Sequence, residues 1–156
     1  MRIGFDFDGT LSVWPQGARI NYEDPTWTLA NSAALLGAVK WVRRILAAGH
    51  EVVIITGRDA RHASSLSYWL RAFVGQGLPV ITRPTHVGLD CTSQAAWKAQ
   101  AMMDARISLY VGDNLRIDQT AARIAQVQFL DAKLFRDGTL PPIPKRIEPV
   151  TEGRKI

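Results

Sequence analysis

The sequence predicts a three-layer α/β fold, in which a parallel sheet carries helices on both faces. Two observations lead to this prediction. Short apolar segments alternate with amphipathic segments at helical spacing along most of the chain, which is the pattern of repeated strand–helix units. One segment, Val52–Ile55, is a continuous β-branched run, as expected for a strand that is buried on both faces. With 156 residues, the chain is long enough for one domain with a sizeable core.

The first half of the chain is expected to add one strand and two helices. Residues 3–7 form an apolar strand, and residues 11–30 are irregular because they contain prolines and glycine. The pair Asn31-Ser32 offers an N-cap for a helix that ends at Gly49 and has apolar residues at helical spacing. A second helix, over about residues 60–74, has its large apolar side chains on one side.

The second half of the chain continues the alternation of strands and helices. Its strands are short and apolar, and its helices begin at residues that can cap them or follow a turn. In chain order we expect a strand at 79–82, a helix capped by Thr92-Ser93 that runs to about 104, a strand at 107–111, a helix at about 117–125 and a strand at 127–130.

The chain is expected to form one domain, residues 1–135, with a flap at residues 11–30. A proline-rich tail follows at residues 136–156 and is expected to be extended. Cys91 is the single cysteine and has no partner for an internal disulfide, so we expect a reducing compartment. No membrane span or signal peptide is visible, and the expected location is the cytoplasm. The net charge of +5 favours anionic partners.

Carboxylates follow two of the predicted strands. Asp6 and Asp8 end the first strand, Asp113 follows the strand at 107–111, and Asp118 comes five residues later. In parallel sheets the ligand site lies beyond the carboxyl ends of the strands, so we expect these acids around one crevice. Five residues on an α-helix correspond to about 140°, so Asp113 and Asp118 converge only through a loop or a first turn.

Acids that are brought together without a partner repel one another and lose water. A divalent cation removes this conflict, and a few hard oxygen ligands with room for water and a phosphate describe a magnesium site. The alternative is that some of these acids are helix caps or turn formers. That alternative stays open for Asp118. For Asp6 and Asp8 beside Asp113, it would require strand ends to carry acids for unrelated reasons.

These residues lie in four segments that resemble the motifs of the haloacid dehalogenase (HAD) superfamily of phosphohydrolases. DFDGTL resembles the first motif and ITGR the second, which ends a strand with Thr or Ser. Lys98, in AAWKAQ, stands where the lysine of the third motif is expected, and VGDNLRID resembles the fourth. The resemblance spans residues 3–118. It implies a Rossmann-like, HAD-like fold and a phosphatase that depends on Mg²⁺.

The resemblance also implies a role for each catalytic residue. Asp6 would be the nucleophile that forms an aspartyl-phosphate, and Asp8 would be the general acid and then the base. An acid at Asp8 is typical of phosphatases and mutases, whereas dehalogenases and P-type ATPases lack it. Thr56 would hydrogen-bond the phosphoryl oxygens, and Lys98 would place positive charge on them. On its own, each could instead be a turn hydroxyl or a solvated lysine, and Lys40 and Lys133 are the fallback candidates for the lysine.

For the metal, the resemblance implies that Asp113 binds Mg²⁺ with Asp6 and the backbone carbonyl of Asp8. Asp118 would hold the waters of the metal or orient Lys98. The remaining titratable candidates show no ligand spacing and are expected to have surface or capping roles: His50, His62 and His86.

Four further residues are expected to bind substrate. Gly9 and Gly57 lie inside the first two motifs. Arg58 is either a substrate contact or half of a salt bridge at a helix start. Residues 82–98 loosely resemble polynucleotide-kinase-type 3′-phosphatase domains, in which an arginine follows the third strand. Arg83 would then contact the substrate, or it is a loop residue before a proline.

The short flap does not by itself identify the substrate. Only 47 residues separate Asp8 from Thr56, so there is no room for a cap domain, and an open site suits a bulky or polymeric phosphate. The flap carries side chains that could stack on bases and meet a phosphate, or simply pack on the domain: Trp14, Arg19, Tyr22 and Trp27.

Nucleotides or nucleic-acid phosphate ends are the favoured substrates. The alternatives are a phosphatase for sugars or other small molecules and an inactive phosphate-binding module. Oligomerisation is a further way to close such a site.

Overall fold

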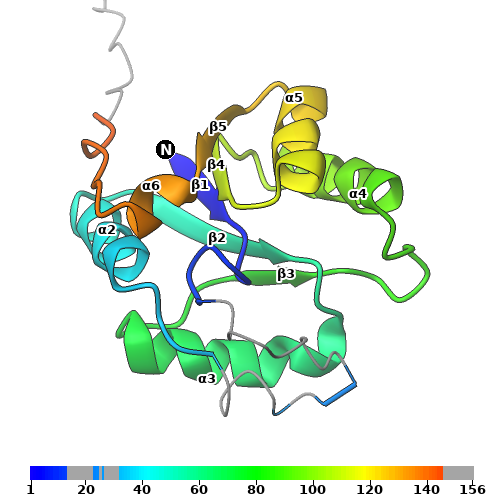
Figure 1. Cartoon of the computed structure of the whole chain (residues 1–156), viewed down its shortest axis with the longest axis horizontal. Coiled ribbons are helices and arrows are strands. Elements are labelled where there is room, and N and C mark those ends of the chain that lie inside the picture. The colour runs from blue at the N-terminus through cyan, green and yellow to red at the C-terminus, as the bar shows by residue number, and fades with distance from the viewer. Residues whose placement is uncertain (14–22, 25, 27–31, 146–156) are drawn as a thin grey trace, which may run out of the picture.

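The computed structural model describes residues 1–13, 23–24, 26 and 32–145. Its centre is a five-stranded sheet with the order β3-β2-β1-β4-β5, in which every neighbouring pair is parallel. The predicted α/β fold is therefore confirmed (Figure 1). The strands are β1 (Arg2–Phe5), β2 (Glu51–Thr56), β3 (Val80–Thr82), β4 (Leu109–Gly112) and β5 (Gln128–Asp131).

Helices cover both faces of the sheet. One face packs against α2, α3 and α6, and the other packs against α4 and α5 (Figure 1). The helices are α2 (Leu36–Ala47), α3 (Ala63–Phe73), α4 (Cys91–Asp104), α5 (Thr120–Ala125) and α6 (Lys133–Arg136), with a 3-10 turn η1 (Ala60–His62) before α3 and a π turn η2 (Leu115–Gln119) before α5.

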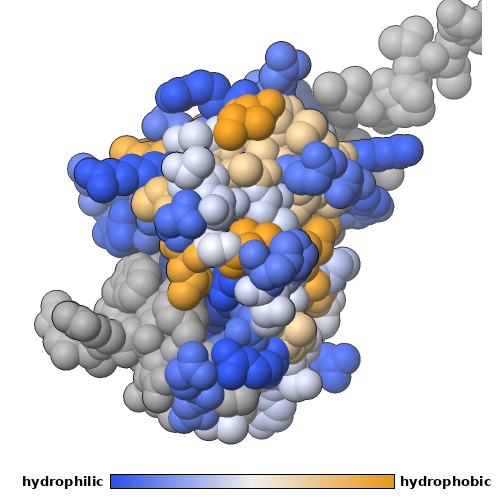
Figure 2. Space-filling view, turned by 90° about the vertical axis from the view of Figure 1, so that its right-hand side faces the viewer, coloured by the Kyte–Doolittle hydropathy of each residue, from blue (hydrophilic) through white to orange (hydrophobic). Residues whose placement is uncertain are grey.

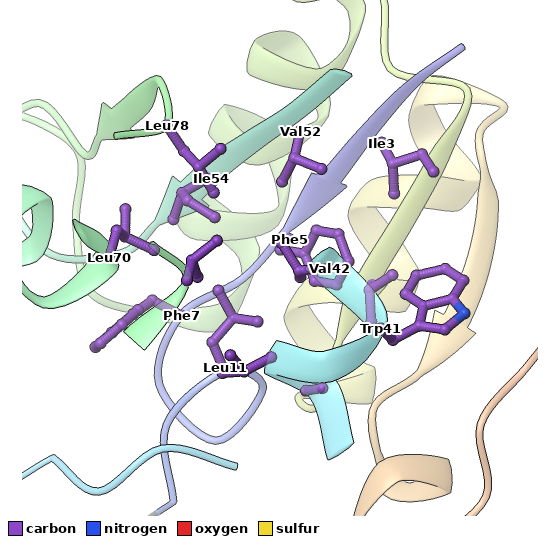
Figure 3. Packing of buried hydrophobic residues seen from close by; sticks show 14 of the residues in the cluster. Ile3, Phe5, Phe7, Leu11, Trp41, Val42, Val52, Ile54, Leu70 and Leu78 are labelled. Carbon is purple, nitrogen blue, oxygen red and sulfur yellow. The ribbon is translucent and has the colours of Figure 1, made fainter. Parts of the chain in front are cut away.

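The alternation of side chains along β1 divides the core in two. Ile3 and Phe5 point to the α2 and α3 side, where Figure 3 shows Phe5 beside Val42 and Trp41. Gly4 faces the other side and makes room for Tyr110, because a Cβ atom at Gly4 would lie 2.7 Å from its ring. The centre of the sheet is thus filled by aromatic rings on both faces.

Several element ends differ from the sequence prediction. The helix expected after Asn31-Ser32 begins at Leu36, and Leu35 precedes it with an extended backbone and no side-chain cap. Asn31 lies outside the described residues. Leu35 N–H instead donates to the Leu11 carbonyl at 2.7 Å, so a contact between distant segments fixes the start of α2.

The cap of α4 also differs from the prediction. Asp90 caps this helix, because its carboxylate accepts a hydrogen bond from Ser93 N–H at 2.8 Å, and the expected cap Thr92-Ser93 lies inside the first turn. The strand expected at 3–7 ends at Phe5, although Asp6 N–H still donates to the Val111 carbonyl at 2.9 Å.

The part of the tail that the structure describes packs on the domain. Trp41 Nε1 donates to the Pro141 carbonyl at 2.9 Å, and His50 Nε2 lies 2.8 Å from the Pro144 carbonyl. Leu140 and Ile143 pack against the core of the α2 face. The described tail therefore lies along α2.

Two of the three histidines are buried, although surface or capping roles were expected for all three. His50 is 4% exposed and His62 is fully buried, whereas His86 is exposed. His50 is drawn inside by the tail, and His62 by a contact with Arg58.

The flap prediction falls largely on residues outside the described ranges, and Trp14, Arg19, Tyr22 and Trp27 are all among them. Among the described residues, no helix has both the length and the apolar character that a membrane span requires. Figure 2, which faces the α4 and α5 side, shows hydrophobic side chains interspersed with hydrophilic ones.

Candidate active site

The topology brings the motif residues to one edge of the sheet. β1 lies between β2 and β4, and all three strands run in the same direction. Asp6 directly follows β1, Thr56 ends β2, and Asp113 directly follows β4. The predicted convergence of these residues at the carboxyl edge is therefore seen in the structure.

A buried lysine connects the acids. Lys98 comes from α4 and is 3% exposed. Its Nζ donates to Asp6 Oδ1 at 2.9 Å and to Asp118 Oδ1 at 2.7 Å. Tyr110 lies beneath this amine, with its hydroxyl 3.3 Å from Nζ, and donates to the Ile55 carbonyl at 2.9 Å. Three hydrogen-bonding groups therefore fix the position of the lysine.

The π turn brings Asp118 back to Asp113. The Asn114 side chain caps this turn by accepting from Arg116 N–H and Ile117 N–H. Asn114 N–H in turn donates to Asp118 Oδ2 at 3.1 Å. Asp118 lies inside this turn and Asp113 lies in the loop just before its cap, so the two acids meet through a loop and a first turn, as the sequence required.

Gly112 permits the approach of Asp118. A Cβ atom at this position would lie 2.5 Å from Asp118 Oδ2 and 2.6 Å from its Cγ. The glycine before Asp113 is therefore a packing requirement of the site as well as the end of β4.

Three carboxylates form a candidate metal centre. Asp6, Asp113 and Asp118 each offer one oxygen, and these oxygens lie within 4.8 Å of one another. Such a set of hard oxygen donors suits a divalent cation. The carboxylate of Asp8 is not part of this trio.

The pKa values of Asp6 and Lys98 reflect this crowding. Burial raises the pKa of Asp6 well above its usual value; Lys98 opposes the rise, and the neighbouring acids Asp118 and Asp113 add to it. Burial alone would lower the pKa of Lys98, but Asp118 and Asp6 hold that pKa well above its usual value. Lys98 thus offsets only part of the rise in the pKa of Asp6, and a bound cation would lower that pKa further.

Asp8 belongs to a second charge system. Its oxygens accept two hydrogen bonds from Arg58, at 2.8 Å from Nε and 2.7 Å from Nη2. Arg58 is fully buried, whereas the Asp8 side chain is 13% exposed. The structure thus pairs Arg58 with a motif acid, and the expected substrate contact of Arg58 stays a prediction.

The other expected substrate-binding residues shape the loops around the cavity. Thr56 is fully buried and its hydroxyl accepts from Arg58 N–H at 3.2 Å. Arg83 is also buried and donates to the Gly57 carbonyl at 2.9 Å and the Val87 carbonyl at 2.5 Å. Gly9 has a φ of 77°, which favours glycine in the turn after Asp8. These contacts describe how the loops are built and leave the expected roles as predictions.

A cavity of about 190 Å³ opens at this edge of the sheet. It is lined by Asp6, Asp8, Gly57, Gln94, Lys98, Asp113, Asn114, Ile117 and Asp118. A larger hollow of about 830 Å³ lies at the opposite edge, where β2 and β3 begin, and its lining is mostly apolar. The smaller cavity is the one that the motif acids share.

Sequence reasoning missed four residues of this region: Gln94, Tyr110, Asn114 and His62. The Asn114 cap could have been found from its place in a Gly-Asp-Asn turn. The others lie inside a helix, a strand and a short turn, and their roles depend on contacts with distant segments.

No protein-family profile matches the chain, and no curated protein matches it. Solved structures do. Two structures of the Pnkp1/Rnl/Hen1 RNA repair complex match with TM-scores of 0.65 and 0.67 at 15% and 14% identity. Each covers 83% of this chain, and the chain spans 41% and 44% of the matched chains, less than half of their length.

A protein from Mesorhizobium loti, named as a "putative had-like phosphatase", matches with a TM-score of 0.55 at 21% identity. The match covers 79% of this chain and 68% of that one. At such identities a likeness speaks for the fold. The chain therefore has a Rossmann-like α/β fold of the HAD-like type, with a carboxylate cluster that fits a divalent metal at the carboxyl edge of its sheet.

Proposed function

We propose that the protein is a magnesium-dependent phosphomonoester hydrolase that acts through an aspartyl-phosphate. The observation that carries this proposal is the separation of two acids two residues apart. Asp6 accepts a hydrogen bond from Lys98 and belongs to the metal trio. Asp8 instead accepts hydrogen bonds from Arg58. A phosphatase of this kind needs one acid to form a bond to phosphorus and another to transfer protons.

In the proposed first step, a carboxylate oxygen of Asp6 attacks phosphorus. The bond from phosphorus to the ester oxygen breaks, and that oxygen takes a proton from Asp8. In the second step, water attacks phosphorus and gives a proton to Asp8. The bond between Asp6 and phosphorus breaks, and inorganic phosphate leaves.

Lys98 and Thr56 are the groups proposed to stabilise the phosphoryl group. Lys98 Nζ is 2.9 Å from Asp6 Oδ1, so its positive charge lies where negative charge builds up. Asp118 holds this lysine at 2.7 Å, which favours the orienting role that the sequence left open. Thr56 would donate its hydroxyl to a phosphoryl oxygen.

Asp6 and Asp113 are the residues proposed to hold Mg²⁺, with the Asp8 backbone carbonyl and with Asp118 close by. When bound, the ion would supply the positive charge that keeps Asp6 ionised and neutralises phosphoryl oxygens.

Nucleotides or nucleic-acid phosphate ends are the proposed substrates. Two observations support this class: the net charge of +5 and the fold shared with chains of an RNA repair complex. The cavity over the motif acids is small, about 190 Å³, and suits a phosphate group more than a whole nucleotide. The rest of the substrate would then lie on the surface around it.

Phosphate release from an aryl phosphate tests the reaction. We expect release by the wild type with Mg²⁺, and none with EDTA or from the Asp6→Asn variant. Asp104→Asn, an exposed aspartate on α4, is the matched control and should keep wild-type activity.

A panel of natural esters then tests the substrate class. A 3′-phosphorylated oligonucleotide and a nucleoside monophosphate should be hydrolysed faster than sugar phosphates. Equal or better turnover of sugar phosphates would remove the preference for nucleic acid. If folded wild type releases phosphate from no ester of the panel, a phosphate-binding module replaces the enzyme as the best interpretation.

A further inference from the structure

The guanidinium group of Arg58 is built into the wall behind Asp8. The two residues are 50 positions apart and come from the loops that follow β2 and β1. Nε and Nη2 of the arginine contact the two different oxygens of the carboxylate, at 2.8 and 2.7 Å. Such a fork-to-fork contact fixes the plane of the carboxylate as well as its distance.

Arg58 is itself held on several sides. Its Cζ lies 5.6 Å from the centroid of the Phe7 ring, and Nη1 is 3.2 Å from His62 Nδ1. A guanidinium group only donates, so Nδ1 must accept in this contact. On the main chain, Arg83 N–H donates to the Arg58 carbonyl at 2.8 Å. The arginine therefore cannot turn away from Asp8 without disturbing these neighbours.

Stability is a poor explanation for this arrangement. Burying a charged pair loses water from both groups, and apolar side chains of similar volume often serve stability as well or better. The pair is also asymmetric, since Arg58 is fully buried and the Asp8 side chain remains 13% exposed. Asp8 lines the cavity, whereas Arg58 is absent from its lining.

We infer that Arg58 is a positioning residue that aims the Asp8 carboxyl group at the ester oxygen of the substrate. This inference rests on the proposed phosphatase function. When the bond between phosphorus and the ester oxygen breaks, its electron pair goes to that oxygen, which takes the proton of Asp8. Arg58 touches neither atom and acts through Asp8 alone.

This role makes a specific kinetic signature. A good leaving group, such as dinitrophenolate, departs without a proton, whereas phenolate and alkoxides need one. Loss of an aimed acid should therefore slow poor leaving groups far more than good ones. A residue that only supports the fold would slow all esters to the same extent.

The experiment compares kcat and KM for dinitrophenyl, nitrophenyl and phenyl phosphate and one alkyl phosphate. The variants are Arg58→Met, Arg58→Lys, Asp8→Asn and the Arg58→Met/Asp8→Asn double variant. Arg58→Lys keeps the charge without the fork, and it also serves if Arg58→Met does not fold. Arg2→Lys is the matched control, because Arg2 also pairs with a carboxylate and a carbonyl, at the opposite edge of the sheet.

We expect kcat/KM, which reports the step in which the leaving group departs, to fall at least tenfold more on phenyl and alkyl phosphate than on dinitrophenyl phosphate in both Arg58 variants. On the poor leaving groups, the double variant should be no slower than Asp8→Asn alone, since both changes remove the same acid. Arg2→Lys should match the wild type on every ester.

Two results separate failure of this inference from failure of the proposed function. If the wild type is active and kcat/KM of the Arg58 variants falls by the same factor on every ester, or if Arg58→Met multiplies the loss of Asp8→Asn on the poor leaving groups, the positioning role is wrong. If the wild type hydrolyses none of the esters, the phosphatase proposal falls, and this inference falls with it.

Discussion

Replacing the proposed nucleophile should stabilise the protein in the absence of divalent cations. In Asp6→Asn, one negative charge leaves the trio. Coulomb's law with an effective dielectric constant of about 20 gives roughly 5.7 kcal/mol of attraction between Lys98 Nζ and Asp6 Oδ1 at 2.9 Å. It gives at least about 3.5 kcal/mol of repulsion for each of the other two acids, whose ligand oxygens are at most 4.8 Å away.

The two repulsions together exceed the single attraction by at least about 1 kcal/mol, before the loss of water from the buried charge is counted. We therefore expect Asp6→Asn to be more stable than the wild type at neutral pH by about 1 kcal/mol or more. For a domain of this size, each kcal/mol corresponds to a rise in Tm of roughly 2–4 °C.

The pH dependence has a definite sign. The pKa of Asp6 in the folded protein is raised above its unfolded value, so the stability of the wild type falls as the pH rises through that raised pKa. The Asp6→Asn variant lacks this loss. Its advantage should be largest at neutral pH and shrink as the solution is made acidic. Mg²⁺ should reverse the order, because the wild type binds the cation more strongly.

Thermal unfolding in EDTA and in Mg²⁺, from pH 5 to pH 8, measures each of these differences. Asp104→Asn is again the control, because an exposed carboxylate should change stability by about 0.5 kcal/mol at most. A cation-free Asp6→Asn variant that is less stable than the wild type at every pH would falsify the view that repulsion of Asp6 by its neighbouring acids exceeds its attraction to Lys98.

Three further substitutions probe the same site. Lys98→Met leaves two buried carboxylates without their partner and should lower the free energy of unfolding by roughly 3–5 kcal/mol in urea titrations; an unchanged midpoint contradicts the buried ion pairs. Gly112→Ala places a methyl group 2.5 Å from Asp118 Oδ2. This variant should lower the free energy of unfolding by about 1–3 kcal/mol and weaken Mg²⁺ binding, which calorimetry measures. An affinity for Mg²⁺ equal to that of the wild type speaks against a role for Asp118 near the cation. Tyr110→Phe leaves the buried Ile55 carbonyl without its donor and should reduce stability by roughly 1–3 kcal/mol, with a wild-type melting curve as the contrary result.

The strands and the acids at their ends could be predicted because each depends on a short stretch of sequence. A β-branched run predicts a buried strand wherever it lies, and a parallel sheet brings all strand ends of one kind to the same edge. Asp6, Asp113 and Lys98 therefore come together as expected. The motif resemblance supplied the pairing of Lys98 with Asp6, which helical spacing alone does not show.

The features that were missed depend on contacts between distant segments. The pairing of Arg58 with Asp8 joins two loops 50 residues apart, and nothing near either residue marks it. The start of α2 is set by the Leu11 carbonyl, which outweighs the capping preference of Asn31-Ser32. The short helix α6 has too few residues to show any periodicity.

The central position of β1 has a consequence for how the chain folds. In the register of the sheet, Arg2 lies beside Glu51, and Ile3 lies beside Leu109. During synthesis β1 is made before both of its neighbours, so it waits for β2 and then, much longer, for β4. Until β4 has been made, one edge of β1 has no strand to pair with, and such edges favour aggregation. Lys98 and β4 must both be synthesised before the Asp6 carboxylate can pair with its lysine and before β1 has a neighbouring strand on each side.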